Sequence, residues 1–291
     1  MKPPTLVNAL FSKPISNWTP ITKGNTPALC GIVHFAPRDT VFVKVATNAQ
    51  TAEWLKKEHQ VYQALPQAPY RPTVLAWHES PTPALALTDL SDHHWPPPWS
   101  DQHVATVLDT LSKISSLNMI NLPSIDDDIA NGWHTIDAHR LPFLQLGLVT
   151  VDWLNACLPA LQAAAHQTSP RGRHLLHFDV RSDNLCIRDG VACLVDWNHA
   201  CLGAANMDVA FWLPSLRVEG GPPPEAILGD APTLAAIVSG FYACRAGLPH
   251  IPQAPKVRIL QQRLLRAALP WAIRALSLPP ADGPSAASLI E

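Results

Sequence analysis

Two patterns of apolar and polar residues divide the chain near residue 91. In the first 90 residues, four short runs rich in apolar and β-branched side chains predict strands at 28–35, 40–46, 73–76 and 84–88. Turn residues at 36–39 predict a hairpin between the first two runs. One segment, 51–65, has its apolar residues at helical spacing instead.

Beyond residue 91, apolar side chains recur about every 3.6 residues, which predicts helices. Such segments lie at 101–118, 150–166, 234–247 and 256–278, and Pro270 is expected to kink or split the last one. Strands followed by helices predict an α+β fold of two lobes. We expect a small β-rich lobe over 1–90 and a larger, mainly helical lobe over 91–291.

A second hairpin is predicted among these helices. Apolar runs at 185–188 and 191–195 flank Asp189-Gly190, a dipeptide typical of two-residue hairpin turns. The hairpin would place Asn184 and Asp196 beside each other, at the same end of two paired strands.

Asp179, Asn184 and Asp196 are the side chains that a phosphoryl-transfer site needs. Asp179 and Asn184 are the candidate catalytic residues, and Asp179 would orient an attacking hydroxyl and take its proton. Asn184 and Asp196 would hold Mg²⁺ against the phosphates of a nucleotide. The alternative is a loop acid followed by an unrelated buried acid, but the hairpin between them favours phosphoryl transfer.

The order His177-x-Asp179, Asn184, hairpin, Asp196-Trp197 resembles the aminoglycoside phosphotransferase branch of the protein-kinase-like fold. Asp208-Val209-Ala210 fits a further Asp of that family. The resemblance implies a two-lobe kinase-like fold, ATP or GTP with Mg²⁺ as cofactors, and a small-molecule hydroxyl as phosphoryl acceptor. It also implies a structural role for His177. Val180-Arg181-Ser182 differs from the Leu-His-Pro-like segment of many members.

The N-terminal lobe carries candidate nucleotide-binding residues. Lys44 lies inside the run 40–46, and Glu58 lies on or beside the apolar face of the helix at 51–65, where an unpaired carboxylate would be costly. Their pairing resembles the strand-Lys to helix-Glu ion pair of the kinase fold, with Lys44 reaching the α- and β-phosphates. Glu53 is the alternative partner.

Two other segments are expected to contact the nucleotide. Residues 21–27 take the position of the nucleotide-covering loop, although they contain one glycine. Asp89 and Leu90, followed by Ser91, would form the hinge between the lobes and meet the adenine edge through backbone groups. Nearby, His93-His94 is interpreted as a solvated loop pair rather than as metal ligands.

Composition narrows the class of partner. A formal net charge of −2 and a pI near 6.7 give no electrostatic case for nucleic acid or an anionic membrane. No apolar run approaches the roughly 18 residues that a membrane span needs. The six cysteines show no Cys-x-x-Cys spacing, so zinc and redox motifs are not predicted. The chain is interpreted as cytoplasmic, with its oligomeric state open.

The acceptor is the least defined part. The pocket is expected between Arg181, residues 126–137 and the helices after 233. The last helix carries five basic residues and few acids, which disfavours polycationic aminoglycosides and leaves neutral or anionic hydroxylated molecules and less cationic antibiotics. The alternative function is a catalytically silent nucleotide-binding regulatory protein, against which the complete residue set argues. A protein-directed kinase is not indicated, since Asp-Phe-Gly and Ala-Pro-Glu are absent.

Overall fold

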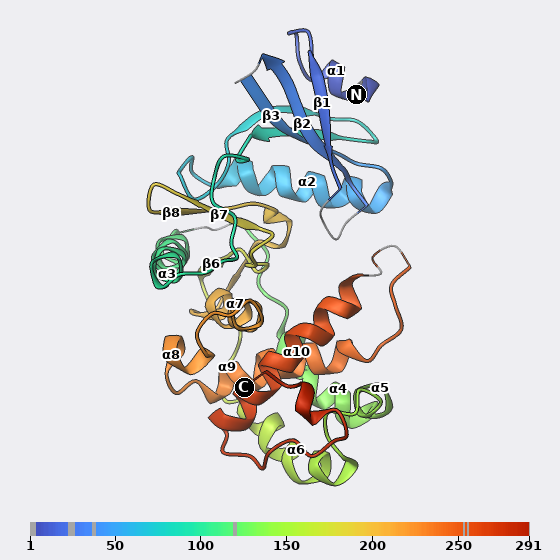
Figure 1. The fold of residues 1–291 in the computed structure, drawn as a ribbon, viewed down its shortest axis with the longest axis vertical. Helices are drawn as coiled ribbons and strands as arrows, with labels where there is room; N and C mark the ends of the chain where they lie inside the picture. The colour runs from blue at the N-terminus through green and yellow to red at the C-terminus, as the bar shows by residue number, and fades with distance from the viewer. Residues whose placement is uncertain are drawn as a thin grey trace.

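A computed structural model describes residues 4–22, 27–36, 39–118, 121–252, 254 and 256–290. It has two lobes along its longest axis, with the sheet and α2 at one end and the helices at the other (Figure 1). This is the α+β, two-lobe architecture expected from the sequence. The predicted boundary near residue 91 lies between β5 and α3, and the division at that residue stays a prediction.

The N-terminal sheet is antiparallel, with strand order β1-β2-β3-β5-β4. Its strands are β1 (Asn17–Ile21), β2 (Leu29–Ala36), β3 (Asp39–Val45), β4 (Val74–His78) and β5 (Ala84–Thr88). The predicted strands are therefore confirmed, whereas β1 was missed. Side chains alternate between the two faces of a strand. Val41, Val43 and Val45 pack with Val7 of α1 (Thr5–Ala9), so Lys44 lies on the other face.

Helix α2 (Ala49–Ala64) covers the face of the sheet on which Lys44 lies. It begins after Asn48, whose side-chain oxygen accepts the backbone N–H of Thr51 at 2.9 Å, a capping contact that fixes the start of the helix. Leu55 and Val61 join Leu85 and Leu87 of β5 in the main apolar core. The predicted helix at 51–65 is confirmed, and its buried side places Glu58 towards the sheet.

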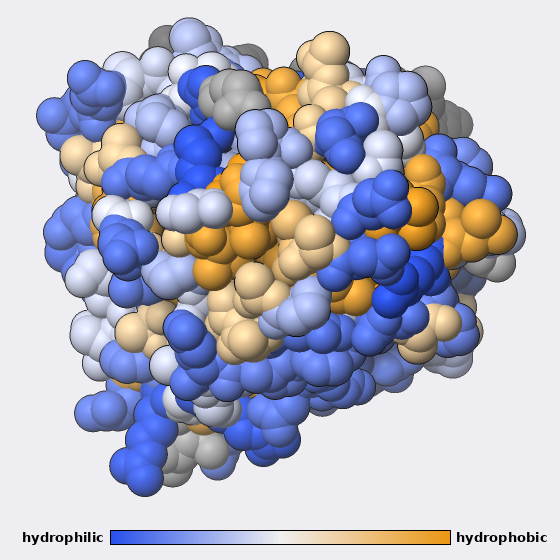
Figure 2. All heavy atoms as spheres, turned by 90° about the horizontal axis from the view of Figure 1, so that it is seen from below, coloured by the Kyte–Doolittle hydropathy of each residue, from blue (hydrophilic) through white to orange (hydrophobic). Residues whose placement is uncertain are grey.

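The C-terminal lobe is built around α9. Its helices are α3 (Asp101–Ser115), α4 (Gly132–Ala138), α5 (Leu141–Leu144), α6 (Val151–Ala165), α7 (Met207–Val218), α8 (Pro224–Leu228), α9 (Pro232–Ala246) and α10 (Lys256–Ala275). α9 packs against α10, α4 and α6, and the fully buried Trp133, Trp212 and Trp271 fill the core between them. Seen from below, apolar patches lie among polar side chains (Figure 2). Among the described residues, no helix has the length and apolar character to cross a membrane.

Pro270 does not split α10, so the prediction of a split is wrong, whereas a kink at this position stays a prediction. Proline has no N–H to donate, which would leave the carbonyl of Arg266 without its helical partner. The backbone N–H of Ile290 takes that place and donates to the Arg266 oxygen at 2.8 Å. The C-terminal segment therefore supplies the hydrogen bond that the proline removes.

Two short ladders lie in the C-terminal lobe. The predicted hairpin is present, with β7 (Leu185–Arg188) paired to β8 (Val191–Leu194) and left-handed φ angles of 50° and 74° at Asp189 and Gly190. A second ladder, which the sequence pattern did not predict, pairs β6 (His174–Leu176) with β9 (Cys201–Gly203). The two ladders flank the segment 177–184 and fix its ends.

The segment that joins the lobes is attached to this hairpin. The backbone of His94 exchanges hydrogen bonds of 3.0 and 2.7 Å with Ile187 of β7. The His94 ring packs against His103, with centroids 4.3 Å apart, so the interpretation of a solvated pair is wrong for His94. The linker is thus joined to the hairpin by a single bridge, which holds His94 against β7.

Candidate active site

Asp208 anchors the first two residues of the loop 177–184. Its carboxylate accepts the backbone N–H groups of His177 and Phe178, each at 2.7 Å. Phe178 has a left-handed φ of 62°, a conformation that these contacts help to hold. Burial raises the pKa of Asp208 to about 6, although both backbone donors favour its ionised form. Asp208, noted in the sequence only through the family resemblance, is therefore a support of the loop.

His177 joins the loop to the strand before Asp196. Its ring is fully buried, Nε2 lies 2.8 Å from the Val195 carbonyl, and Nδ1 lies 3.3 Å from the backbone N–H of Asp179. These partners assign the proton to Nε2, since a carbonyl only accepts and an N–H only donates. Burial lowers the pKa of His177 to about 4, so the ring is neutral near pH 7. The contacts agree with the expected structural role.

Asp179 and Asn184 are in direct contact. The Asn184 amide nitrogen donates to Asp179 Oδ2 at 2.8 Å and to the Asp179 backbone oxygen at 2.9 Å. Because this nitrogen faces Asp179, the amide oxygen of Asn184 is the atom that can bind a metal. Burial raises the pKa of Asp179, and the charge of Arg181 opposes that rise.

Arg181 lies closer to the candidate base than the sequence indicated. Its Nη1 donates to Asp179 Oδ1, while Nε and Nη2 donate to Asp183 at 2.9 and 3.1 Å. The two carboxylates hold the pKa of Arg181 above its usual range against the effect of burial. Carboxylate oxygens each have two lone-pair sites, so an acceptor hydroxyl can still donate to Asp179.

The predicted pairing of Lys44 with Glu58 is observed. Lys44 Nζ lies 2.9 Å from both carboxylate oxygens of Glu58 and also contacts Asp196 Oδ1. The alternative partner Glu53 pairs instead with Lys57 at 3.2 Å. Burial alone would lower the pKa of Lys44, but the charges of Asp196 and Glu58 outweigh it and raise that pKa. Lys44 thus joins the two lobes through charge.

Asp196 and Asn184 are neighbours, as the hairpin predicted. The backbone N–H of Val195 donates to the backbone carbonyl of Asn184 at 2.9 Å, which aligns the two strand ends. Asp196 has a left-handed φ of 64°, and its side chain is 42% exposed, so a ligand can reach its oxygens. Burial favours neutral Asp196, but Lys44 outweighs it and lowers the pKa of that carboxyl.

The donor set at this point suits a hard cation. Asn184 and Asp196 offer an amide oxygen and a carboxylate, and Mg²⁺ prefers oxygen ligands of which one or two are carboxylates, with phosphate and water completing the shell. In the described ranges no group of three or more His, Cys, Asp or Glu could hold a metal ion. The residues therefore fit a cation that is shared with a phosphate group.

The hinge residues Asp89 and Leu90 make contacts with residues close to them in the chain and with the hairpin. Asp89 Oδ1 accepts the backbone N–H of Ser91 at 2.9 Å, and the Leu90 carbonyl accepts Trp95 Nε1 at 3.0 Å. The Leu90 side chain packs with Cys186 and Cys193 of the hairpin. A role for Asp89 and Leu90 towards adenine stays a prediction. Of the expected covering loop at 21–27, residues 23–26 lie outside the described residues.

Only some of the residues expected to line the acceptor pocket lie near Asp179. Arg181 lies at Asp179, but Asp127 pairs with Arg171 at 2.7 Å and Asp137 pairs with Arg140 at 2.6 Å, all in contact with solvent. These acids are neutralised by local arginines, so they do not form a concentrated negative surface for a polycation.

Glu219, at the end of α7, was not identified from the sequence. Its carboxylate accepts Ser182 Oγ at 2.5 Å and Trp99 Nε1 at 2.9 Å. It therefore joins the loop that carries Asp179 to the linker between the lobes. Its partners are 37 and 120 residues away in the chain, so no local pattern signals the contact.

Comparisons with known proteins agree with this geometry. The model of the phosphotransferase enzyme family matches residues 20–241. No curated protein matches. A spectinomycin phosphotransferase in complex with ADP and spectinomycin superposes with a TM-score of 0.60 at 10% identity, covering 94% of this chain and 97% of that one.

Two further structures share the fold. A thermostable mutant of an aminoglycoside phosphotransferase, in complex with ADP and hygromycin B, has a TM-score of 0.59 at 15% identity and covers 94% of this chain and 96% of that one. A choline/ethanolamine kinase family protein from Mesorhizobium loti has a TM-score of 0.54 at 14% identity, covering 90% and 91%.

Proposed function

Because the chain belongs to the phosphotransferase enzyme family, we propose that it transfers the γ-phosphoryl group of ATP or GTP to a hydroxyl of a small molecule, with Mg²⁺. The family and the kinase-like fold identify the general class of the protein, a small-molecule phosphotransferase. The observation that carries the finer proposal is the geometry around Asp179. Asn184 orients that carboxylate, the hairpin places Asp196 beside Asn184, and Lys44 reaches Asp196 from the other lobe.

The nucleotide phosphates would lie between Lys44 and the hairpin. Lys44, positioned by Glu58, supplies a cation to the phosphates, and Asn184 with Asp196 would hold Mg²⁺. When bound, the metal neutralises charge on the phosphate oxygens. In this structure Lys44 contacts Asp196 directly. Nucleotide binding would therefore move the Lys44 ammonium from the Asp196 carboxylate to the phosphates.

Asp179 would act on the acceptor. The hydroxyl must come within about 3 Å of the carboxylate and in line with the phosphoryl group. Asn184 and Arg181 each hold one oxygen of Asp179, so the carboxylate cannot rotate freely. Burial raises the pKa of Asp179, which would strengthen it as a proton acceptor, and the Arg181 charge opposes that rise. Arg181 also places a cation where phosphoryl oxygens would gather.

The related structures support a small-molecule acceptor and a nucleotide. Two of them are complexes with ADP, one with hygromycin B and one with spectinomycin. These ligands belong to those proteins, whose identity to this chain is 15% or less. They support the nucleotide and the general class of reaction, whereas the acceptor of this chain follows from its own residues.

We also propose a cytoplasmic location. All six cysteines are free thiols, and Cys186 and Cys193 face each other across the hairpin without forming a disulfide. Free thiols are typical of proteins kept in a reducing compartment. Expression with location-specific labelling would test this point directly.

Asp179→Asn tests the enzyme against the alternative of a silent nucleotide-binding protein. The variant should bind Mg·ATP with near-normal affinity. Its rate of phosphoryl transfer to an acceptor hydroxyl should fall by about 10²–10⁴-fold. Nucleotide affinity is measured by calorimetry and turnover by ADP release over a panel of hydroxylated molecules. If the wild-type protein binds Mg·ATP but releases no ADP with any acceptor, the regulatory alternative holds. A loss below about tenfold at saturating acceptor would show that Asp179 is not the base.

A further inference from the structure

An aromatic wall leads from Asp179 to the end of α9. Phe178, next to Asp179 in the chain, lies 5.1 Å from Phe211 of α7 between ring centroids, and Phe211 lies 5.2 Å from Phe241 of α9. All three side chains are partly exposed. The wall is therefore a half-buried apolar surface that begins at the candidate base and ends in the helical lobe.

Arg245 lies at the far end of this wall. Its guanidinium carbon is 3.9 Å from the centroid of the Phe241 ring. Nη1 donates to the Phe241 backbone oxygen at 2.9 Å and to Cys244 Sγ at 3.1 Å. A guanidinium carries five N–H donors, so the remaining nitrogens can bind a further group. Across the described ranges, no carboxylate lies within ion-pair distance of Arg245.

Arg258, in the first turn of α10, is tied by a hydrogen bond to Pro249, which follows Arg245 by four residues in the chain. Its Nε donates to the Pro249 carbonyl at 3.1 Å, and Nη1 donates to Gln261 at 2.7 Å, both neutral partners. Burial lowers the pKa of Arg258, and the nearby charge of Arg245 lowers it further. Two neighbouring guanidinium groups without a carboxylate repel each other, and a bound anion would relieve that repulsion.

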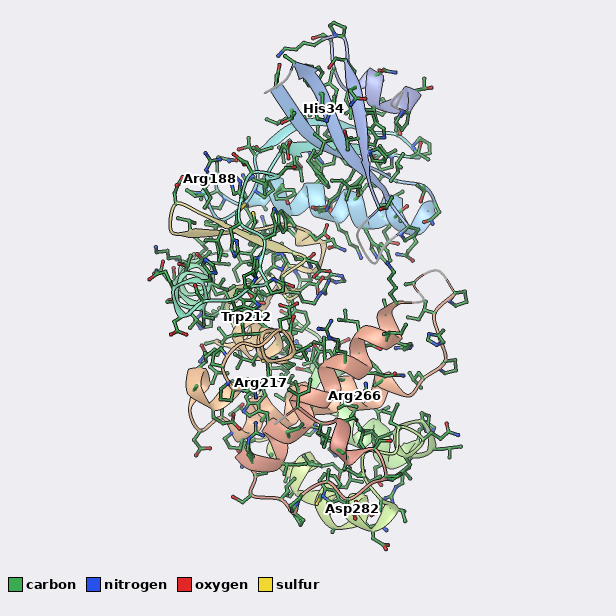
Figure 3. All side chains as sticks on the ribbon, in the orientation of Figure 1. His34, Arg188, Trp212, Arg217, Arg266 and Asp282 are labelled. Atoms are coloured by element: carbon green, nitrogen blue, oxygen red, sulfur yellow. The ribbon has the colours of Figure 1, made fainter. Side chains whose placement is uncertain are left out.

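The other arginines of α10 lie beyond its first turn. Arg274 pairs with Glu225 at 2.7 Å, and Arg266, labelled on α10 in Figure 3, donates to Ser288 at 3.1 Å. The first turns of α10, which carry Arg258, rise from the helical lobe towards the sheet lobe (Figure 1). Arg258 thus lies on the part of α10 nearest the sheet lobe, and Arg245 lies against the aromatic wall that begins next to Asp179.

We propose that Arg245 and Arg258 bind an anionic group of the phosphoryl acceptor, a carboxylate or a phosphate, while the aromatic wall contacts its body and a hydroxyl reaches Asp179. This inference rests on the proposed function. Bidentate geometry makes arginine well suited to both anions. A cationic acceptor is disfavoured because Arg245 already occupies the face of Phe241 where an ammonium would bind.

Binding of simple anions tests the arginine pair without requiring turnover. Inorganic phosphate and acetate are titrated separately into the protein saturated with Mg·ADP, so that the nucleotide site is already filled. We expect saturable binding of at least one anion, weakened roughly 10- to 100-fold in Arg245→Met and in Arg258→Met, because each loses charged hydrogen bonds. Arg245→Lys should retain part of the affinity, and Arg263→Met, on an exposed part of α10, should match the wild type.

The two anions distinguish between the two anionic groups that the acceptor could carry. Preference for phosphate indicates a phosphorylated acceptor, and preference for acetate indicates a hydroxy acid. Matched acceptors, glycerol with glycerate and glycerol 3-phosphate and ribitol with ribonate, extend the test to ADP release. Absence of anion binding, or equal binding by the wild type and both Met variants, overturns the inference. Arginine-dependent anion binding without ADP release from any acceptor supports the anion site but removes the proposed function, and with it the assignment of the anion to a phosphoryl acceptor.

Discussion

Replacing Lys44 with methionine should make stability depend on the protonation of Glu58. Glu58 is 3% exposed, and both of its oxygens lie 2.9 Å from the Lys44 ammonium. Burial raises the pKa of Glu58, and the charge of Lys44 lowers it. Lys44→Met removes the opposing charge and leaves burial, so the folded protein can keep Glu58 only by protonating it or by accepting a buried unpaired carboxylate.

The size of the effect follows from the burial of the pair. Leaving one member of a buried ion pair without its partner costs about 3–5 kcal/mol, a large part of a typical stability of about 5–15 kcal/mol. Asp196 contributes little to this loss, because its side chain is 42% exposed and regains water. Each unit by which the pKa of Glu58 rises adds about 1.4 kcal/mol to the pH-dependent part.

The sign of the pH dependence is fixed by the direction of that shift. A carboxyl whose pKa is higher in the folded state contributes its stability below the unfolded value, about 4.3 for Glu, and loses it as pH rises through the folded pKa. The unfolding free energy of Lys44→Met should therefore fall between pH 5 and pH 8, more steeply than that of the wild type.

Urea unfolding followed by tryptophan fluorescence at several pH values measures this difference. Lys44→Met/Glu58→Gln serves as the control, since it buries no charge and should recover most of the stability lost at pH 8. A single variant within about 1 kcal/mol of the wild type at pH 8, with no added pH dependence, would refute the reasoning.

Three further predictions concern the metal, the loop and the acceptor. Asp196→Asn should lose most of its Mg²⁺-dependent nucleotide affinity while keeping its fold, as calorimetry and circular dichroism would show; unchanged Mg·ATP affinity would contradict the assignment. Ser182→Ala removes a hydrogen bond to the Glu219 carboxylate and should cost about 1.5–3 kcal/mol of unfolding free energy, whereas a Ser116→Ala control, which loses a bond to a neutral backbone oxygen, should cost less. Kanamycin-like polyamines should be poor acceptors in an ADP-release assay, and efficient saturable phosphorylation of them would prove this wrong.

The parts of the site that the sequence predicted are those that local rules determine. Asp189-Gly190 specifies a two-residue turn, and that turn alone places Asn184 beside Asp196. Lys44 and Glu58 could be paired in advance because their places resemble the strand-Lys to helix-Glu ion pair of the kinase fold, and because a Glu on an apolar helix face needs a cationic partner. Strand and helix patterns located the two residues, and the resemblance paired them.

Other contacts depend on long-range packing that no local pattern encodes. Glu219 joins Ser182 and Trp99, and the Ile290 N–H completes α10 at Pro270, so both features appear only once distant segments meet. The short strands β6 and β9 were missed for the same reason, since three residues are too few to show periodicity. The prediction of a split in α10 failed because it considered the proline without its substitute donor.

The departure of Val180-Arg181-Ser182 from the family pattern gains meaning from these contacts. Ser182 offers a hydroxyl to Glu219, where a proline has no donor, and Arg181 places a permanent charge on Asp179. Both changes lie on the side of the loop where we propose that the acceptor binds, while Lys44, Asn184 and Asp196, on the proposed nucleotide side, keep the pattern. Arg181 pairs with both Asp179 and Asp183, so it offsets the negative charge at the candidate base and adds no net positive charge there. The case for an anionic acceptor therefore rests on Arg245 and Arg258, which lie on two separate helices.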